Sequence, residues 1–215
     1  MPIEAKICGV RTREAAVAAA RGGARWIGFV FFPKSPRALT PLEALALAEG
    51  VPPALGTVGL FVDPDNDLLD ETLHQVPLDM IQLHGSEPPR RVAEIRARFD
   101  RPVMKAIKVA KPEDVEQADQ YLGVVDRLLF DSKAPKSLKN ALPGGNAIAF
   151  DWRILAGRSW TKPWMLSGGL GPTNVGEAVG ITGATAVDVS SGVESRPGVK
   201  EPAKIAEFLD ATQRL

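Results

Sequence analysis

Short apolar runs alternate along this chain with longer stretches in which apolar residues recur every three or four positions. The short runs are rich in Val, Ile, Leu and Phe and are bounded by Gly, Pro or charged residues, as buried strands are. They predict strands at residues 3–8, 25–32, 56–62, 79–83, 102–109, 124–130, 163–166 and 184–189. The longer stretches predict helices at residues 12–21, 41–49, 67–76, 87–99, 112–122, 150–156, 172–179 and 201–215.

Local start signals support several of these boundaries. Thr40 and Glu43 have the spacing of a capping box, with Pro41 at the first helical position. Ser86 is placed to cap the helix that ends near residue 99. Pro172 stands where the helix after a glycine turn is expected to begin.

Strand and helix alternate along the whole chain, which predicts a parallel sheet. Eight such units predict closure into a single (β/α)8 TIM barrel over residues 1–215, with brief connections because the chain is short for this fold. A doubly wound open sheet is the alternative, but it usually has fewer strands and a glycine motif in its first strand-to-helix turn. Here that turn reads Cys8-Gly9-Val10-Arg11.

Composition and charge narrow the class of protein. Apolar residues make up 45% and charged residues 24%, as in ordinary soluble globular domains, and the formal net charge is +0. We therefore expect no nucleic acid or membrane partner, and the absence of a secretory signal pattern predicts a cytoplasmic protein. A single cysteine, Cys8, and two distant histidines, His74 and His84, predict neither a disulfide nor a metal site.

Candidate chemistry lies at the ends of the predicted strands, where (β/α)8 barrels form their active sites. The polar or reactive residues at these ends are Cys8, Asp63, His84, Asp131 and Asp188. Because side chains alternate along a strand, each residue just before Cys8, His84 and Asp131 lies on the opposite face, and each is apolar. Lys6 and Gln82 share the polar face two positions earlier. We expect this face to line the barrel mouth.

Two of these residues suit paired acid–base chemistry. Cys8 is a candidate base, because a cation at Lys6 would favour its thiolate, although a lone cysteine is commonly a buried apolar residue. Asp131 is a candidate acid, because partial burial would favour its protonated form; otherwise it caps a helix or starts a turn. Asp63 precedes Pro64 and is expected to start a turn.

For two further side chains, Arg37 and His84, the sequence allows two interpretations each. Arg37 follows the second predicted strand and either forks onto a carboxylate or is a solvated loop charge. His84 either contacts the substrate or is a hydrogen-bonded loop residue. The segment from 132 to 146 is the longest stretch without a predicted element, and its position after a barrel strand suggests a lid.

Two glycine-containing loops near the C-terminus predict a phosphate site. Ser167-Gly168-Gly169 follows the seventh predicted strand, and Ser190-Ser191-Gly192 follows the eighth. Glycine lets backbone N–H groups approach an anion closely, although either turn alone could be an ordinary tight turn. Loops at these two positions hold phosphate in many barrels. The pair therefore predicts a phosphate held by Gly168, Gly169, Ser191 and Gly192.

Together these motifs resemble phosphoribosylanthranilate isomerase of tryptophan biosynthesis. The resemblance runs in order from residue 3 to about residue 197 and rests on Lys6-Ile7-Cys8-Gly9, Ser35-Pro36-Arg37, Gln82-Leu83-His84-Gly85, Leu129-Phe130-Asp131, Ser167-Gly168-Gly169-Leu170 and residues 188–194. It implies a (β/α)8 barrel that performs an Amadori rearrangement without cofactor or metal. The substrate implied is N-(5-phosphoribosyl)anthranilate, and the product is 1-(2-carboxyphenylamino)-1-deoxyribulose 5-phosphate.

The resemblance also implies roles for individual residues. Asp131 matches the general acid that opens the ribose ring, and Cys8 matches the general base that removes the C2′ proton. Arg37 matches the group that holds the anthranilate carboxylate, and Asp188 matches an aspartate beside the substrate. The chain departs from the family pattern at residues 144–147, which read Gly-Gly-Asn-Ala where the family usually has Gly-Gly-Thr-Gly.

Other functions remain as alternatives. A ribulose-phosphate epimerase requires a pattern of metal ligands that this sequence lacks. An indole-glycerol-phosphate synthase requires a catalytic Lys and Glu set, and the sequence has no obvious one. A barrel that binds a phosphometabolite without catalysis would keep the glycine loops but would not need Cys8 and Asp131. The expected partner is a small phosphosugar, and the expected assembly is a monomer or a homodimer.

Overall fold

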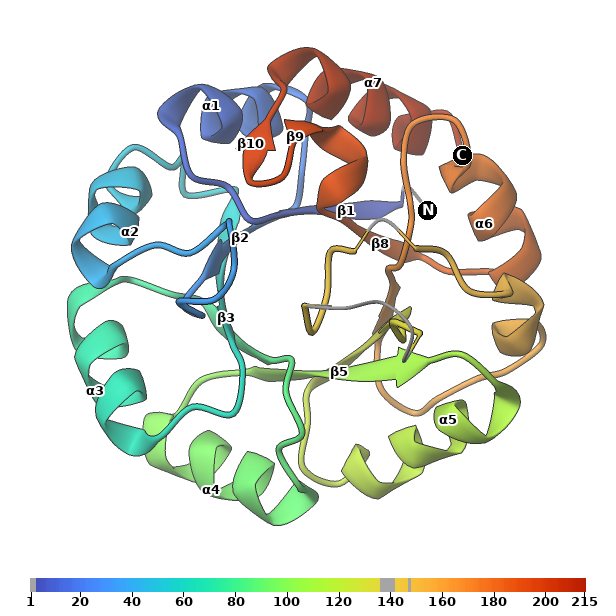
Figure 1. Ribbon diagram of the computed structural model, residues 1–215, viewed down its shortest axis with the longest axis horizontal. Coiled ribbons are helices and arrows are strands. Elements are labelled where there is room, and N and C mark those ends of the chain that lie inside the picture. The colour runs from blue at the N-terminus through green and yellow to red at the C-terminus, as the bar shows by residue number, and fades with distance from the viewer. Residues whose placement is uncertain (1–2, 136–141, 147) are drawn as a thin grey trace.

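Parallel strands that close on one another form the centre of the computed structural model, which describes residues 3–135, 142–146 and 148–215. Within these residues eight strands pair in sequence order and helices surround them (Figure 1). The predicted (β/α)8 barrel is therefore confirmed. The strands are β1 (Glu4–Cys8), β2 (Trp26–Val30), β3 (Gly56–Phe61), β4 (Met80–Leu83), β5 (Val103–Val109), β6 (Arg127–Ser132), β7 (Trp164–Leu166) and β8 (Ala186–Val189).

The outer layer consists of α-helices joined to the strands by short connections. They are α1 (Arg13–Arg21), α2 (Pro41–Ala48), α3 (Asn66–Gln75), α4 (Pro89–Phe99), α5 (Pro112–Glu116), α6 (Val175–Thr182) and α7 (Pro202–Gln213). The capping box is present, since the Thr40 side chain accepts from the Glu43 backbone N–H and Glu43 accepts from that of Thr40. None of the helices in the described ranges combines the length and apolar character that crossing a bilayer requires.

Two predicted helix starts are wrong, and hydrogen bonds explain both. α4 begins at Pro89 without a side-chain cap, and the Ser86 N–H instead donates to Asp63 Oδ1. α6 begins at Val175, after a turn that contains Pro172. The side chain of Asn174 closes that turn, because it accepts from the Gly171 N–H and donates to the Gly169 carbonyl.

Other predicted elements differ in length or type. β6 begins three residues later than expected, at Arg127, and extends through Asp131. The helix predicted at residues 112–122 is α5 followed by a 3-10 helix, η1 (Gln117–Tyr121), and the one predicted at 150–156 is a 3-10 turn, η2 (Trp152–Leu155).

A β-hairpin after the eighth strand was not predicted. It comprises β9 (Glu194–Arg196) and β10 (Val199–Lys200) and follows the 3-10 turn η3 (Ser191–Val193). The turn dipeptide Pro197-Gly198 was the available signal. Gly198 has φ +81°, and a Cβ there would overlap the carbonyl oxygen of Pro36, so glycine lets the hairpin pack on the loop that carries Arg37.

Apolar side chains fill both faces of the sheet. Ile7, Leu83 and Phe130 pack against the helices, as the alternation predicted. A separate cluster contains Val58, Met80, Met104, Ala106, Leu129, Met165 and Ala186, the residues of the other strand face. Burying each of the large side chains contributes roughly 1.5–3 kcal/mol. Because this cluster occupies the barrel interior, the polar residues nearer the strand ends lie at the C-terminal mouth.

Candidate active site

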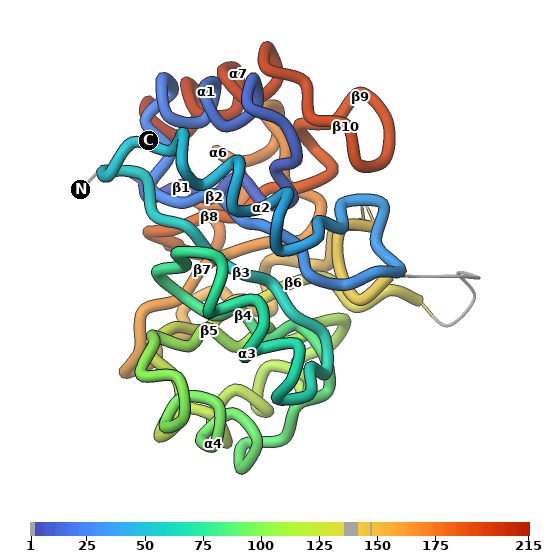
Figure 2. The backbone as a smooth tube through the Cα atoms, turned by 90° about the vertical axis from the view of Figure 1, so that its left-hand side faces the viewer, coloured from blue at the N-terminus to red at the C-terminus, as the bar shows by residue number. Residues whose placement is uncertain are grey.

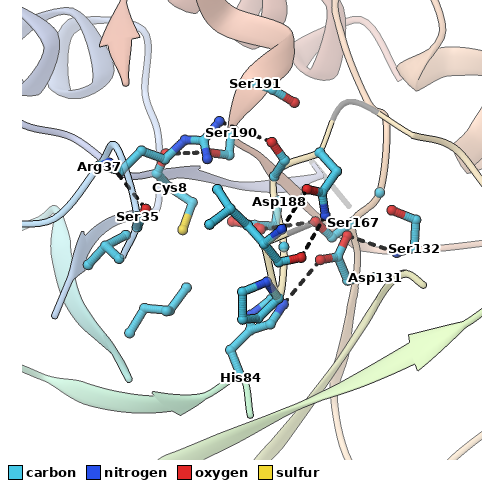
Figure 3. A pocket seen from close by; sticks show the side chains of 18 of the residues that line it. Cys8, Ser35, Arg37, His84, Asp131, Ser132, Ser167, Asp188, Ser190 and Ser191 are labelled. Atoms are coloured by element: carbon cyan, nitrogen blue, oxygen red, sulfur yellow. Dashed lines mark hydrogen bonds and ion pairs between the residues drawn. The ribbon is translucent and has the colours of Figure 1, made fainter. Parts of the chain in front are cut away.

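A single pocket at the C-terminal end of the barrel brings the predicted site residues together. Its lining includes Cys8, Arg37, His84, Asp131, Gly168, Gly169, Asp188 and Ser191. Figure 3 shows Cys8 and Asp131 on opposite sides of the pocket, with the sulfur of Cys8 directed inward. Polar groups that converge in an otherwise apolar hollow are typical of a small-molecule site.

A buried ion pair lies directly beneath Cys8. The parallel pairing of β1 with β8 sets Lys6 opposite Asp188, and Lys6 Nζ lies 2.8 Å from Asp188 Oδ1. Ser167 Oγ donates to the other oxygen, Asp188 Oδ2, at 3.1 Å. Burial acts against the charge of Lys6, but Asp188 and Cys8 together outweigh it and keep the pKa of Lys6 above its ordinary value. Both Asp188 oxygens are therefore held in place.

The thiol of Cys8 does not have the depressed pKa expected from its neighbour. Burial raises the pKa of Cys8, and the attraction of Lys6 does not offset it, because Asp188 shares that cation and itself disfavours a thiolate. Gly28 provides the space for this thiol, since a Cβ there would lie 3.0 Å from the sulfur. A raised pKa favours the protonated thiol, and it makes the thiolate a stronger base.

Asp131 lies across the pocket in a hydrogen-bonded setting. Its Oδ1 accepts from the Ser132 N–H at 2.8 Å, and its Oδ2 lies 3.1 Å from His84 Nε2. Both side chains are buried, and His84 lines the pocket while it is also hydrogen-bonded, so both interpretations of His84 fit its position. An acid held at two oxygens keeps a fixed direction toward a bound molecule.

Arg37 is buried, which excludes a solvated loop charge, and its guanidinium forks onto a carboxylate of the protein itself. Arg37 Nε and Nη2 donate to the two oxygens of Glu194 at 2.8 and 2.9 Å, and Nη2 also donates to the Gly145 carbonyl. Lys200 Nζ donates to the same carboxylate at 2.7 Å. Burial disfavours the charge of Glu194, yet the bonds from Arg37 and Lys200 keep its pKa below the ordinary value. The role of Glu194 was missed from the sequence.

Glu194→Gln should destabilise the fold by roughly 3 kcal/mol at pH 7, because it leaves Arg37 and Lys200 partly unpaired in a buried place. The pKa of Glu194 is lower in the folded than in the unfolded chain, so its contribution is present above the unfolded value and lost as the pH falls through the folded value. The stability gap between the wild type and the variant should therefore shrink below about pH 4. Urea unfolding of both proteins at several pH values measures this difference in unfolding free energy. A difference that does not change with pH would contradict the lowered pKa of Glu194.

The two glycine loops lie against one another at the far side of the pocket. Gly168 and Gly169 both have positive φ, at +89° and +69°, and a Cβ on Gly169 would lie 2.7 Å from the backbone nitrogen of Ala149. Gly192 does not line the pocket. A Cβ there would overlap the carbonyl oxygen of Leu170, so Gly192 instead lets the two loops touch.

Part of the predicted lid covers the pocket. Gly144 is so close that a Cβ there would lie 2.7 Å from His84 Nε2 and 2.8 Å from Asp131 Oδ2. Asn146, where the chain departs from the family pattern, exchanges two hydrogen bonds with the backbone of Leu142 and closes a turn over residues 142–146. Figure 2 shows this part of the chain at the same end of the barrel as the hairpin. Residues 136–141 of the predicted lid, and residue 147 just after it, lie outside the described residues.

The parts of the chain that the structure describes contain no set of side chains suited to bind a metal ion. No group of three or more His, Cys, Asp or Glu side chains there is arranged to hold an ion.

Comparisons with known proteins place the chain in one family. The family model for N-(5'phosphoribosyl)anthranilate (PRA) isomerase matches residues 5–211. The N-(5'-phosphoribosyl)anthranilate isomerase of Rhodospirillum centenum is 57% identical over 97% of each chain, and that of Paramagnetospirillum magneticum is 54% identical over 99% of this chain and 98% of its own.

Solved structures give the same result. The phosphoribosyl anthranilate isomerase of Thermotoga maritima superposes with a TM-score of 0.88 at 35% identity and covers 99% of this chain and 100% of its own. A phosphoribosyl anthranilate isomerase crystallised with reduced 1-(o-carboxyphenylamino)-1-deoxyribulose 5-phosphate gives 0.85 at 34% identity and covers the same shares. With a family model that matches nearly the whole chain and relatives above half identity, the chain belongs to the N-(5'-phosphoribosyl)anthranilate isomerase family.

Proposed function

We propose that this chain converts N-(5'-phosphoribosyl)anthranilate into 1-(2-carboxyphenylamino)-1-deoxyribulose 5-phosphate in tryptophan biosynthesis, with Asp131 as general acid and Cys8 as general base. The observation that carries the proposal is the placement of these two residues on opposite sides of one pocket. The ligand of the crystallised relative, with its aryl carboxylate, open sugar and phosphate, supports the substrate class.

The acid step opens the sugar ring. A protonated Asp131 gives its proton to the ring oxygen, the bond between C1′ and that oxygen breaks, and the nitrogen lone pair forms a C=N bond. Asp131 becomes a carboxylate, which the Ser132 N–H at Oδ1 stabilises.

The base step moves the double bond. Cys8 as thiolate removes the C2′ proton, and the electrons of the broken C–H bond form C1′=C2′ and neutralise the nitrogen. The enol then becomes the ketone as its O–H proton is lost and C1′ gains one. A cationic C=N group beside Cys8 favours the thiolate and so opposes the effect of burial, which raises the pKa of Cys8.

The two anionic ends of the substrate, the carboxylate and the phosphate, bind at different sides of the pocket. Arg37 engages Glu194 through Nε and Nη2, so we propose Nη1 for the anthranilate carboxylate. Asp188 and His84 face the sugar from β8 and the end of β4. The phosphate is proposed to meet the loop backbone at Gly168, Gly169 and Ser191, with Gly192 holding the two loops together.

Ser191→Asp should raise KM at least about tenfold, since a carboxylate at this loop opposes a bound phosphate dianion. Ser191→Asn is the matched control, because it has the same size without the charge, and its KM should stay near that of the wild type. Steady-state kinetics measures both. This pair is a cleaner test than a substitution at Gly169, where any side chain meets Ala149. Equal KM values for the two variants would remove Ser191 from the phosphate site.

Turnover of the fluorescent anthranilate substrate tests the function itself. We expect the purified chain to consume it without added metal or cofactor and to release the ketose phosphate. A chain that binds the reduced product analogue but turns over no substrate would be a non-catalytic binding barrel, and the proposal would be wrong.

A further inference from the structure

A buried amide lies behind the proposed acid, outside the pocket lining. Gln82 on β4 is fully buried, and its Nε2 lies 2.9 Å from His84 Nδ1. The other ring nitrogen, His84 Nε2, lies 3.1 Å from Asp131 Oδ2. Three side chains thus form a continuous line from the barrel interior to the carboxyl group that faces the substrate.

The orientation of the Gln82 amide determines which nitrogen of His84 carries hydrogen, and therefore what His84 offers to Asp131. A neutral imidazole has one N–H and one bare nitrogen, and an amide nitrogen can only donate. With Gln82 Nε2 facing the ring, Nδ1 must accept, so the single N–H lies on Nε2 and donates to Asp131. With the amide turned over, Nδ1 would carry the hydrogen, and a bare Nε2 would face Asp131. The Asp131 proton would then be drawn toward His84 instead of the pocket.

The amide oxygen of Gln82 makes glutamine an unfavourable residue for stability at this position. Gln82 Oε1 is buried and has no hydrogen-bond partner among the residues that the structure describes. A buried acceptor without a hydrogen-bond partner destabilises the folded chain. The neighbouring interior positions hold Met80 on β4 and Met104 opposite Gln82 on β5, and a methionine would fill this space without a buried polar group. The amide nitrogen is therefore the part of Gln82 that accounts for its presence.

We propose that Gln82 is a positioning residue that holds His84 in the Nε2–H form, so that His84 always donates to Asp131 and the Asp131 proton is directed at the substrate. The donated hydrogen bond also strengthens as Asp131 becomes a carboxylate, which favours proton transfer. The effect on turnover rests on the proposed role of Asp131, whereas the state of the imidazole does not.

Nitrogen NMR of the ring reads that state directly. His84 and His74 are the two histidines, and His74 is exposed on α3, so their signals separate by environment. In the wild type we expect a bare Nδ1 and a protonated Nε2 on His84. Gln82→Glu offers only acceptors when ionised, so Nδ1 should gain a hydrogen. Gln82→Met keeps the length but removes the donor, so both forms should be present.

Kinetics supplies the second readout. Both Gln82 variants should lose roughly 10-fold to 100-fold in kcat, the effect of misdirecting a catalytic group, while KM changes little because Gln82 does not line the pocket. Gln117→Met makes the same change at an exposed position and should leave the His84 spectrum and kcat unchanged.

The outcomes separate this inference from the proposed function. A wild-type spectrum with hydrogen on Nδ1, or a reversed spectrum in Gln82→Glu with unchanged kcat, would overturn the positioning role. If Gln82→Met unfolds, Gln82→Glu still decides between these outcomes. A wild-type chain with the expected spectrum but no isomerase activity would leave the imidazole assignment standing and reject the function of Asp131.

Discussion

Replacing Asp131 by Asn should lower kcat by roughly 100-fold to 10,000-fold, the usual contribution of a general acid. The amide is nearly the same size and can still accept from the Ser132 N–H, but it has no acidic proton to give to the ring oxygen. The fluorescence assay for anthranilate substrate measures this loss. Binding of the reduced product analogue should survive, since that ligand needs no proton.

Asp126→Asn is the matched control, because it makes the same change next to the opposite end of β6. Asp126 accepts from the Val103 N–H and pairs with Arg96 at 2.8 Å, away from the pocket. Its substitution should lower stability modestly and leave kcat near the wild-type value. An Asp131→Asn enzyme with kcat within a few-fold of the control would show that ring opening does not depend on Asp131.

Replacing Cys8 by Ser should lower kcat by about 100-fold or more. Serine is close in size and can form hydrogen bonds, but a hydroxyl ionises far less readily than a thiol in a pocket where burial already raises the pKa of Cys8. The loss should appear in kcat, while the dissociation constant of the reduced product analogue stays close to that of the wild type.

Alkylation gives an independent measure of the same thiol. Cys8 is the only cysteine, so iodoacetamide reports on it alone. Because only the thiolate reacts, the rate should rise with pH with a midpoint above that of a free thiol, and bound product analogue should protect. Near-normal turnover of Cys8→Ser would assign Cys8 to packing, and the base step would have to be abandoned.

The strand pattern was predictable because it is a local property. Period-two alternation places Cys8, His84 and Asp131 on the interior face and Ile7, Leu83 and Phe130 toward the helices. The structure agrees, because the first three line the pocket and the last three belong to the core packed against the helices. Strand ends were less certain because they depend on pairing. β6 continues through Asp131 since β5 offers partners up to Val109, which pairs with Ser132.

Helix starts near the loops were decided by contacts across the fold. A local rule selected Ser86 as a cap and Pro172 as a first helical residue. The backbone of Ser86 is instead held by Asp63, which lies 23 residues earlier, and the turn before α6 is closed by Asn174. Side chains that bond to backbone in a loop compete with capping, and the sequence does not rank the two.

The barrel, the family and the set of polar strand-end residues could be predicted from the chain alone, because these depend on periodicity and on motifs that lie in one order. The electrostatics of the site could not, because they depend on how the chain folds. Arg37 and Glu194 are 157 residues apart, and the hairpin of β9 and β10 brings them within 2.8 Å. Lys6 forms an ion pair with Asp188 as well as lying near Cys8, so burial has the largest effect on the pKa of the Cys8 thiol. Charges act through space at short range, and the distances between distant residues exist only once the barrel has closed.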